Sequence, residues 1–475
     1  MNSLALHTDF YEINMAYSFF RDNIHEKKAV FEVYFRKNPF ENGYAVFAGL
    51  ERVVDYIERF KFSDEDIEYL QQFDYTVEFL EYLRNLKFTG TIRSCLEGEV
   101  VFANEPLLIV EADLIQAQLI ETALLNTINF QTLIATKASR IKNLVGDKLL
   151  FEFGARRAQE MDAALWGSRA AYISGFDGTS LVDAGKIFNI PIVGTHAHSF
   201  VQVYQDELTA FRKYAKYNQR CTFLVDTYNT LESGIPNAIK VADEFKGTDR
   251  VFEGIRIDSG DLSYHSNEAR RMLDEAGYYD TKVIVSNDLD EDTIASLLLE
   301  GAKIDGYGIG TKLVTSYSQP ALGAVYKLVA IEEDGELINV IKISNNIEKI
   351  TNPGLKNVYR IINKETNKAE GDYMTLAGEI INTDEQLRMY NDQNPFVYKA
   401  VINYKLHNIH QTIYQDGNLV YELPDIEIIR DYHKKSLAIL WDEHKRYRYP
   451  ARYYVNFSLN LYTTKHDLIN KYKEV

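Results

Sequence analysis

The sequence predicts an α/β protein built around an irregular (β/α) barrel of about seven parallel strands. Strand-like and helical segments alternate between residues 149 and 310 about every 20 to 30 residues, as in parallel sheets with right-handed crossovers. Each predicted strand in this region ends in glycine or polar residues. The flanking regions lack this alternation. We therefore expect an N-terminal α/β domain (1–140), the barrel (141–330) and a smaller C-terminal region (331–475) that packs on the first two.

Length, composition and charge restrict the class of protein. The 475 residues exceed the usual size of a single core, and 46% hydrophobic with 25% charged residues is typical of a soluble globular protein. The formal net charge of −17 argues against a nucleic-acid partner, because phosphate contacts need clustered Lys and Arg. An anionic substrate would therefore need a locally basic pocket.

The cysteines and the apolar segments indicate a reducing compartment and no membrane partner. Cys95 and Cys221 lie far apart and match neither a disulfide framework nor a zinc motif. The chain has no apolar run of about 18 residues, and its first residues do not have the pattern of a signal peptide. We therefore expect a cytoplasmic protein.

The N-terminal region has mixed α and β patterns. Residues 29–35 alternate as a strand does. Apolar residues recur at helical spacing across 44–60, and a longer helical pattern covers 115–140, with a break expected near 126–130. Glycine, asparagine and proline divide 89–109 into short strands.

The central region contains the strands of the predicted barrel and the helices between them. The strands are expected at 149–153, 173–177, 190–193, 222–226, 254–258, 283–287 and 305–310. Helices are expected at 181–188, 230–245, 263–276 and 290–300. Polar residues at one strand end could be helix N-caps or site residues, but a whole series of such ends favours a shared site.

The alternation ends after about residue 325. Residues 326–332 and 337–343 are expected to form two strands joined at Asp334-Gly335, which is a turn sequence. The remaining residues form the C-terminal region, whose role the pattern does not indicate.

Two pairs of charged residues follow strand ends. Arg156 and Arg157 could bind a carboxylate or phosphate with their paired donors, or be surface residues of an acidic protein. Arg256 and Asp258 point to the same side of their strand. They could bind a phosphorylated sugar and its hydroxyls, or form a structural ion pair.

Residues at the last two predicted strands suggest a phosphate site. Gly308 and Gly310 allow backbone N–H groups to approach a phosphate closely, and Thr311 follows them. Ser286 and Asn287 end the preceding strand, and (β/α) barrels often bind phosphate at this position.

His196 and His198 have three interpretations. A His-x-His pair on a strand could bind a metal, but no further histidine lies near the other strand ends. Each ring could be an ordinary core or surface residue. The more specific interpretation is a nucleophile, acid or base.

Taken together and in this order, these segments resemble the bacterial nicotinate phosphoribosyltransferase family, within the type II phosphoribosyltransferases. The resemblance covers nearly the whole chain. The motifs that carry it are TDFY (8–11), FRKNP (35–39), GYAVFAGL (43–50), NFQ (129–131), FGARRAQ (153–159), GTHAHSF (194–200), RIDSGD (256–261) and PGLK (353–356).

The resemblance implies an enzyme that joins nicotinate to 5-phosphoribosyl 1-diphosphate (PRPP), giving nicotinate mononucleotide and diphosphate in NAD biosynthesis. It implies that ATP is a co-substrate, hydrolysed through a transiently phosphorylated histidine. Mg²⁺ is the implied cofactor and enters with the diphosphate, without a protein-only metal site. The implied assembly is a homodimer with active sites at the subunit interface.

Roles for single residues follow from the same resemblance. The phosphorylated histidine matches His198, in the Ala-His-Ser motif, and not His196. Tyr11 and Phe153 match the pair that sandwich the pyridine ring, and residues near the N-terminus are expected to reach a neighbouring subunit.

Charged and small residues complete the implied site. Arg156 and Arg256 match residues near the ring's carboxylate and the sugar phosphate, and Asp258 matches the residue beside the ribose hydroxyls. The implied 5′-phosphate loop contains Gly308, Gly310 and Thr311.

The chain departs from related enzymes at two points. Nicotinamide phosphoribosyltransferase carries Gly-Thr-Asp where this chain has Gly178-Thr179-Ser180. An aspartate there would bind an amide and repel a carboxylate, so Ser180 favours nicotinate as the substrate. Some relatives carry a C-terminal zinc knuckle, which two separated cysteines cannot form.

Three alternatives stay open at this point. The chain could act on nicotinamide or quinolinate, although quinolinate would need more cations than Arg156, Arg157 and Arg256 supply. A lyase or aldolase would use a Schiff-base lysine at a strand end, where this chain has Glu, Asp, Thr and Ser. A non-catalytic binding protein would not need the Arg256–Asp258 pair beside phosphate-type glycines.

Overall fold

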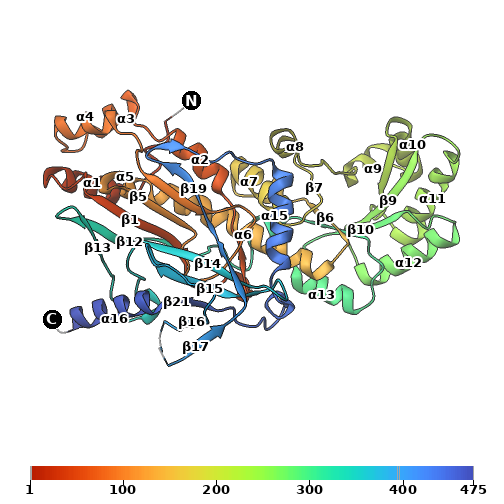
Figure 1. The fold of residues 1–475 in the computed structure, drawn as a ribbon. Coiled ribbons are helices and arrows are strands. Elements are labelled where there is room, and N and C mark those ends of the chain that lie inside the picture. Colours follow the sequence, from red (N-terminus) through yellow and green to blue (C-terminus); the bar gives the residue numbers. More distant parts are fainter. Residues whose placement is uncertain (1–2, 393, 395, 474–475) are drawn as a thin grey trace. The chain divides into compact units, whose positions relative to one another are not determined.

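The computed structural model describes residues 3–392, 394 and 396–473, and the chain divides into two compact units. Unit 1 comprises Met1–Thr136 and Ala321–Val475, and unit 2 comprises Lys137–Pro320. Red, orange and blue segments of Figure 1 thus belong to unit 1, and green ones to unit 2. The N-terminal and C-terminal regions, expected separately from the sequence, lie in one unit because N-terminal strands form the middle of a sheet whose two sides are completed by strands from later in the chain.

That sheet of unit 1 contains, among the described residues, seven strands in the order β13-β12-β1-β5-β3-β19-β20, with antiparallel neighbours throughout. The strands are β1 (Lys28–Phe35), β3 (Thr91–Cys95), β5 (Leu108–Asp113), β12 (Ala324–Glu333), β13 (Glu336–Asn339), β19 (His410–Gln415) and β20 (Asn418–Leu419). The interior strand β1 confirms the strand expected at 29–35. Its side chains Phe31, Val33 and Phe35 are part of the main hydrophobic core.

The predicted hairpin after residue 325 is confirmed. β12 and β13 pair with Glu333 opposite Glu336. The turn residues Asp334 and Gly335 both have a left-handed backbone, with φ of 49° and 83°. Two such residues are typical of the type I′ turn, whose twist matches that of the strands it joins.

A second sheet comes from the C-terminal region alone, in the order β17-β16-β21-β15-β14-β18. Its strands are β14 (Lys356–Asn363), β15 (Ala369–Leu376), β16 (Leu387–Tyr390), β17 (Tyr398–Val401), β18 (Tyr404–Asn408) and β21 (Val455–Phe457). A short antiparallel pair joins β2 (Ala45–Val46) and β4 (Val100–Val101). The helices of unit 1 are α1 (Phe10–Arg21), α2 (Leu50–Glu58), α3 (Asp64–Leu70), α4 (Val77–Asn85), α5 (Leu114–Leu119), α15 (Ile426–Ala438) and α16 (Leu459–Lys473), with single turns η1 (Pro39–Glu41), η4 (Ile347–Lys349) and η5 (Asp442–Lys445).

Two helix predictions in the N-terminal region need correction. The segment 44–60 is helical only from Leu50, because it begins with the short strand β2 and Gly49, at the N-cap of α2, has a left-handed backbone (φ 113°). The segment 115–140 forms α5 and α6 (Glu121–Val145), and the break lies at Ile120 rather than near 126–130.

A buried ion cluster links the N-terminal and C-terminal segments of unit 1. Arg360 on β14 is fully buried and donates hydrogen bonds from Nε and Nη2 to both carboxylate oxygens of Asp372, at 2.9 and 2.8 Å. Its other donors reach Glu99 and the carbonyl oxygen of Val100. Although burial opposes ionisation, Arg360 holds the pKa of Glu99 down at about 2. We call these residues the Arg360 cluster.

Unit 2 is built on a parallel sheet. Within 137–320, all of which the structure describes, six strands have the order β7-β6-β11-β10-β9-β8, with parallel neighbours throughout. The strands are β6 (Leu149–Glu152), β7 (Gly178–Thr179), β8 (Arg220–Leu224), β9 (Val251–Ile257), β10 (Lys282–Ser286) and β11 (Gly306–Ile309). The predicted α/β class with a parallel sheet is therefore confirmed.

Helices accompany these strands, and several of them pack on the sheet: α10 contacts β8, α11 contacts β9, and α12 contacts β9 and β10. The helices of unit 2 are α7 (Glu160–Ile173), α8 (Val182–Phe188), α9 (His198–Tyr204), α10 (Glu207–Tyr217), α11 (Ile235–Glu244), α12 (Leu262–Glu275), α13 (Glu291–Leu299) and α14 (Thr311–Val314), with the turns η2 (Ala155–Arg157) and η3 (Thr230–Gly234). In the part of the chain that the structure describes, no helix has the length and apolar character needed to cross a membrane.

Two of the seven expected strands are not strands of this sheet. Residues 173–177 follow the end of α7, where Gly175 turns the chain with a left-handed backbone (φ 110°). Residues 190–193 make a single parallel bridge, between Ile192 and Thr179. Pro191 has no N–H to donate, so it cannot extend the ladder. The described sheet therefore has six strands, one of them the shorter β7, instead of seven.

Candidate active site

The predicted site residues of the central region lie at the carboxyl ends of the parallel strands of unit 2. Arg256 is the penultimate residue of β9, Asp258 follows that strand, and Ser286 ends β10. Arg256 Nη2 donates to Asp258 Oδ1 at 3.0 Å, so the two side chains lie on one side of the chain as their spacing predicts. Ser286 Oγ also donates to Asp258 Oδ1. We call Arg256, Asp258 and Ser286 the Arg256 cluster.

Arg256 is held by further contacts. Its Nε donates to Ser286 Oγ at 2.8 Å and its Nη1 to Thr195 Oγ1 at 3.3 Å. The guanidinium also lies over the ring of Phe153, 5.5 Å from the ring centre. A planar cation fixed from three sides and stacked on an aromatic ring is well oriented to bind an anion.

His198 lies beside this cluster at the first residue of α9. Its Nδ1 is 3.2 Å from Thr227 Oγ1, and its Nε2 lies 3.9 Å from both Asp226 Oδ1 and Asp258 Oδ2. The side chain is 40% exposed. An accessible imidazole with one nitrogen in a hydrogen bond and the other directed at carboxylates can act as a nucleophile.

Asp226 is a site residue that the sequence-based assignment missed. Its side chain is only 1% exposed. Oδ2 accepts hydrogen bonds from the backbone N–H of Asp258 at 2.8 Å and from Ser259 Oγ at 2.6 Å. Oδ1 has no hydrogen-bond partner among the described residues and faces His198. The available signal was its place at the end of the strand expected at 222–226.

The structure separates the roles of the two histidines. His196 is buried, and its Nε2 accepts a hydrogen bond from the backbone N–H of Leu224 at 3.2 Å. Burial lowers the pKa of His196 to about 4, so the ring is neutral at pH 7. His196 therefore has a structural role. Over the described residues, no group of three or more His, Cys, Asp or Glu side chains could hold a metal ion.

Gly308 and Gly310 make room for Phe153. A Cβ atom on Gly308 would lie 2.4 Å from two ring atoms of Phe153, and one on Gly310 would lie 3.0 Å from its carbonyl oxygen. The backbone N–H of Phe153 also donates to Ile309 O at 2.8 Å. These glycines are thus required for the placement of the aromatic ring, whatever they contribute to phosphate binding.

Glu152 supports this end of the sheet from inside. Its carboxylate accepts hydrogen bonds from Thr179 Oγ1 at 2.7 Å, from Ser168 Oγ at 2.9 Å and from the N–H of Gly154. Burial raises the pKa of Glu152. The buried carboxyl group of Glu152 therefore connects β6 to β7 and to α7, just below the polar residues at the strand ends.

Four predicted site residues lie near the strand ends but outside the Arg256 cluster. Arg156 is exposed in the turn η2, Ser180 is exposed after β7, and Asn287 is exposed with a left-handed backbone (φ 98°). Thr311 begins α14. Among the described side chains, none of these four is hydrogen-bonded to the Arg256 cluster, so ligand contacts remain a prediction for them.

Tyr11 belongs to unit 1. It lies in the first turn of α1, with 48% of the residue exposed. Burial of its hydroxyl, with Glu121 nearby, raises the pKa of Tyr11. Its ring is therefore accessible and its hydroxyl stays protonated.

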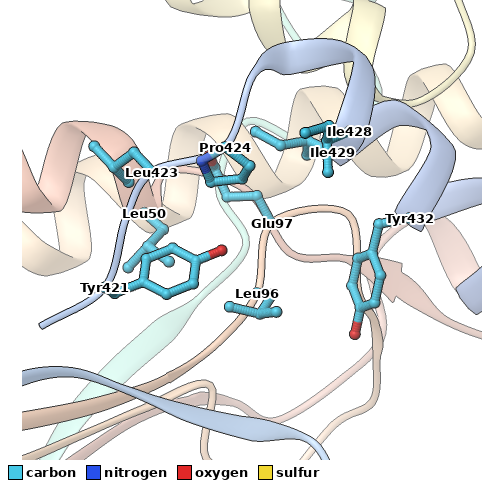
Figure 2. A pocket seen from close by; sticks show the side chains of 9 residues that line it. All are labelled: Leu50, Leu96, Glu97, Tyr421, Leu423, Pro424, Ile428, Ile429 and Tyr432. Atoms are coloured by element: carbon cyan, nitrogen blue, oxygen red, sulfur yellow. The ribbon is translucent and has the colours of Figure 1, made fainter.

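A separate pocket of unit 1 has a different chemistry (Figure 2). It has a volume of about 120 Å³, and Tyr421 and Tyr432 lie on opposite sides of it. Its described lining consists of Leu50, Leu96, Glu97, Tyr421, Leu423, Pro424, Ile428, Ile429 and Tyr432. No basic side chain is among them, so this pocket does not suit a phosphate or a carboxylate.

The fold and the geometry of unit 2 define a class: an α/β protein whose parallel sheet presents an oriented arginine, two aspartates and an accessible histidine at its carboxyl edge. Family comparisons narrow that class. The "Nicotinate phosphoribosyltransferase (NAPRTase) family" profile matches residues 149–376, and the N-terminal and C-terminal domain profiles of the same enzyme match 6–129 and 355–465. The chain therefore belongs to the nicotinate phosphoribosyltransferase family.

Individual relatives agree with this assignment. The chain is 57% identical to nicotinate phosphoribosyltransferase of Bacillus subtilis over 99% of this chain and 96% of the relative. The crystal structure of human nicotinic acid phosphoribosyltransferase superimposes with a TM-score of 0.85 and 29% identity, covering 97% of this chain and 99% of the human one. The structure of a nicotinate-nucleotide pyrophosphorylase from Pyrococcus furiosus (TM-score 0.69, 23% identity, covering 91% and 95%) shares the fold.

Proposed function

We propose that the protein joins nicotinate to PRPP, giving nicotinate mononucleotide and diphosphate for NAD biosynthesis, and couples this to ATP hydrolysis through phosphorylation of His198. Family membership supports the transfer reaction. The observation that carries the coupling is the position of His198: an accessible imidazole beside two aspartates and next to the oriented Arg256.

The surroundings of His198 support the proposed phosphorylation step. We assign the ring proton to Nδ1, where it is donated to Thr227 Oγ1, and this tautomer leaves the lone pair of Nε2 available. Nε2 attacks the γ-phosphorus of ATP, the bond to the bridging oxygen breaks, and ADP leaves with that electron pair. Water later cleaves the Nε2–phosphorus bond and releases phosphate. Asp226 and Asp258 hold the imidazole and stabilise its positive charge.

The transfer step needs orientation more than a protein nucleophile. The C1–diphosphate bond of PRPP breaks through an oxocarbenium-like state, and the pyridine nitrogen forms the new bond to C1. We assign Asp258 to the ribose hydroxyls, Arg256 and Arg156 to anionic groups, and Ser286, Asn287, Gly308, Gly310 and Thr311 to the 5′-phosphate. Phe153 supports the pyridine ring from unit 2, and Tyr11 does so from unit 1 of a partner in a homodimer.

Mg²⁺ fits this site as a companion of the diphosphate. The unpaired, buried Oδ1 of Asp226 and the carboxylate of Asp258 are the hard oxygen donors that this ion prefers. Two carboxylates are too few to hold it without phosphate oxygens. When bound with diphosphate, the ion supplies charge neutralisation of the leaving group.

Ser180 and the cysteines support two further assignments. Ser180 is exposed and neutral, so it does not repel the carboxylate of nicotinate, and we expect nicotinate to be preferred over nicotinamide. Cys95 and Cys221 are buried free thiols, which fits a reducing cytoplasm.

The test is product formation from PRPP and Mg²⁺ with nicotinate or nicotinamide, each with and without ATP. We expect nicotinate mononucleotide to form faster with ATP, and ADP to be released. His198→Ala should lose the whole ATP-dependent increment, whereas His196→Ala should keep most of it because His196 is structural. Nicotinamide turnover equal to that of nicotinate would refute the substrate assignment. An ATP increment that survives in His198→Ala would refute the phosphohistidine.

A further inference from the structure

Glu12 is a buried carboxyl group of unit 1 to which the proposed reaction gives no role. It lies in the first turn of α1 and is fully buried. Thr8 Oγ1 donates a hydrogen bond to its Oε2, and Thr122 Oγ1 lies 2.7 Å from its Oε1. Thr122 belongs to the first turn of α6, so Glu12 joins the starts of two helices.

The contacts of Thr122 indicate where a proton resides. Its Oγ1 lies 3.0 Å from Asp9 Oδ2, and it accepts the backbone N–H of Asp9 at 3.3 Å. A hydroxyl has one proton to donate and can accept two hydrogen bonds. If Thr122 donates to the exposed carboxylate of Asp9, the 2.7 Å contact with Glu12 requires a proton on Glu12. A neutral Glu12 thus lets all three groups satisfy one another within the protein.

The surroundings of Glu12 favour the same state. The ionisable groups that face it are carboxyl groups and tyrosine hydroxyls, so none of them can carry a positive charge. They are Asp9 and Tyr11 from its own segment, Glu121 from α6, Tyr56 from α2 and Tyr326 from β12. Burial raises the pKa of Glu12 to about 7 against the two threonine hydrogen bonds, with a smaller contribution from the charges of Glu121 and Asp9. Burial raises the pKa of Glu121, while the charge of Lys327 and a hydrogen bond from Tyr11 act in the opposite direction.

We propose that Glu12 is a positioning residue: as a neutral acid it fastens the first turn of α1 to α6 and thereby fixes Tyr11. Tyr11 follows Phe10 at the start of α1, directly between the Asp9 and Glu12 attachments. The effect on nicotinate binding rests on the proposed function, because only there does Tyr11 support the pyridine ring. The effect on the order of α1 does not depend on it.

The sign of the pH dependence follows from linkage. The folded chain binds the proton of Glu12 more tightly than the unfolded chain, since the pKa rises from 4.5 to about 7. The attachment is therefore complete below about pH 4.5 and is lost as the pH rises through 7. Above that pH, Asp9, Glu12 and Glu121 are three neighbouring carboxylates at one helix junction, and the first turn of α1 loosens.

The test compares amide hydrogen exchange of Ile13 to Ala16, the first amides of α1 with intrahelical acceptors, at pH 6 and pH 8, expressed as protection factors, in the wild type and Glu12→Gln. A carboxamide mimics the neutral acid, because it donates to Thr122 and accepts from Thr8. We expect wild-type protection to fall by roughly threefold to tenfold between these values, and the Gln variant to stay level. Equal behaviour of the two proteins would overturn the proposal.

Thr122 provides a second test that retains the carboxyl group. Thr122→Val removes the bridging hydroxyl at nearly constant volume and should lower the protection of Ile13 to Ala16 already at pH 6, whereas Thr122→Ser should restore it. If Val protects as well as Thr, the bridge does not hold the helix. Glu207→Gln is the matched control, since Glu207 is another buried glutamate that accepts a hydroxyl hydrogen bond, from Ser233 at 2.6 Å in unit 2.

Steady-state kinetics separate this proposal from the proposed function. The nicotinate KM of the wild type should rise by about threefold between pH 6 and pH 8, with a smaller change in kcat, and Glu12→Gln should not show this rise. If exchange changes as expected but the KM does not, Glu12 does not position Tyr11 for nicotinate. If no nicotinate is turned over at any pH, the proposed function fails and the exchange result still decides the attachment of α1.

Discussion

Two arginine clusters, one in each unit, have nearly the same composition and opposite properties. The Arg360 cluster of unit 1 and the Arg256 cluster of unit 2 each pair an arginine with an aspartate on the sheet. Arg360 and Asp372 are both fully buried. In the Arg256 cluster, the side chains of Arg256 and Asp258 are 15% and 28% exposed, and His198 beside them is 40% exposed.

The difference shows that an Arg–Asp pair is structural or functional according to its surroundings. Arg360 lies between two carboxylates and a carbonyl oxygen, all inaccessible, so no ligand can compete for it. Arg256 has one carboxylate partner and two hydroxyls, and an accessible face beside the ring of Phe153. An incoming phosphate or carboxylate can therefore share its donors.

The largest expected effect is on stability, at Arg360. Arg360→Met should lower the free energy of unfolding of unit 1 by about 3–5 kcal/mol, because it leaves Glu99 and Asp372 as unpaired buried carboxylates. Chemical denaturation followed by circular dichroism measures it. Arg360→Lys, which keeps the positive charge but not the paired donors of the guanidinium, should lower the free energy of unfolding by less. A Met variant as stable as the wild type would show that the cluster contributes no net stability.

Arg256 should show the reverse pattern. Arg256→Ala should raise the KM for PRPP or nicotinate at least tenfold, about 1.4 kcal/mol of lost interaction. The free energy of unfolding should change by less than about 1 kcal/mol, because the pair is partly exposed. Initial rates and denaturation of the same preparation test both parts. A large loss of stability with unchanged KM values would make the two clusters alike.

The smallest effect is expected at Ser180. Ser180→Asp places a carboxylate where solvent screens it, so the preference for nicotinate over nicotinamide should fall by only about fivefold, about 1 kcal/mol. The ratio of kcat/KM for the two substrates measures the change, and Ser180→Asn is the neutral control of the same size. If Asn shifts the ratio as much as Asp, size rather than charge determines the preference.

The sequence predicted the strands of unit 2 best where local pattern and packing agree. The strands expected at 149–153, 254–258 and 283–287 correspond to β6, β9 and β10 within a few residues. The strand predictions were wrong where a single glycine or proline changes the course or the hydrogen bonding of the backbone. Gly175 turns the chain after α7, and Pro191 removes a donor from the segment that was expected to complete the barrel.

The site was predictable in part. The period-two spacing of Arg256 and Asp258 predicted their pairing, which the structure confirms. Asp226 was missed because its contacts with Asp258 and His198 join segments about 30 residues apart. The neutral state of Glu12 could not be foreseen either, since it depends on hydroxyl groups brought together by folding.

The flanking of the N-terminal strands by later strands in the main sheet of unit 1 has a consequence for the order of synthesis. β1 pairs with β5, which follows within the same N-terminal segment, and with β12, which the ribosome adds only after all of unit 2. β3 likewise pairs with β19, which is synthesised later still. Unit 2 can complete its sheet while the nascent N-terminal strands still have unpaired edges. A chain released before β12 would expose those edges and be prone to aggregation, so premature termination is more harmful here than in a protein whose domains are continuous.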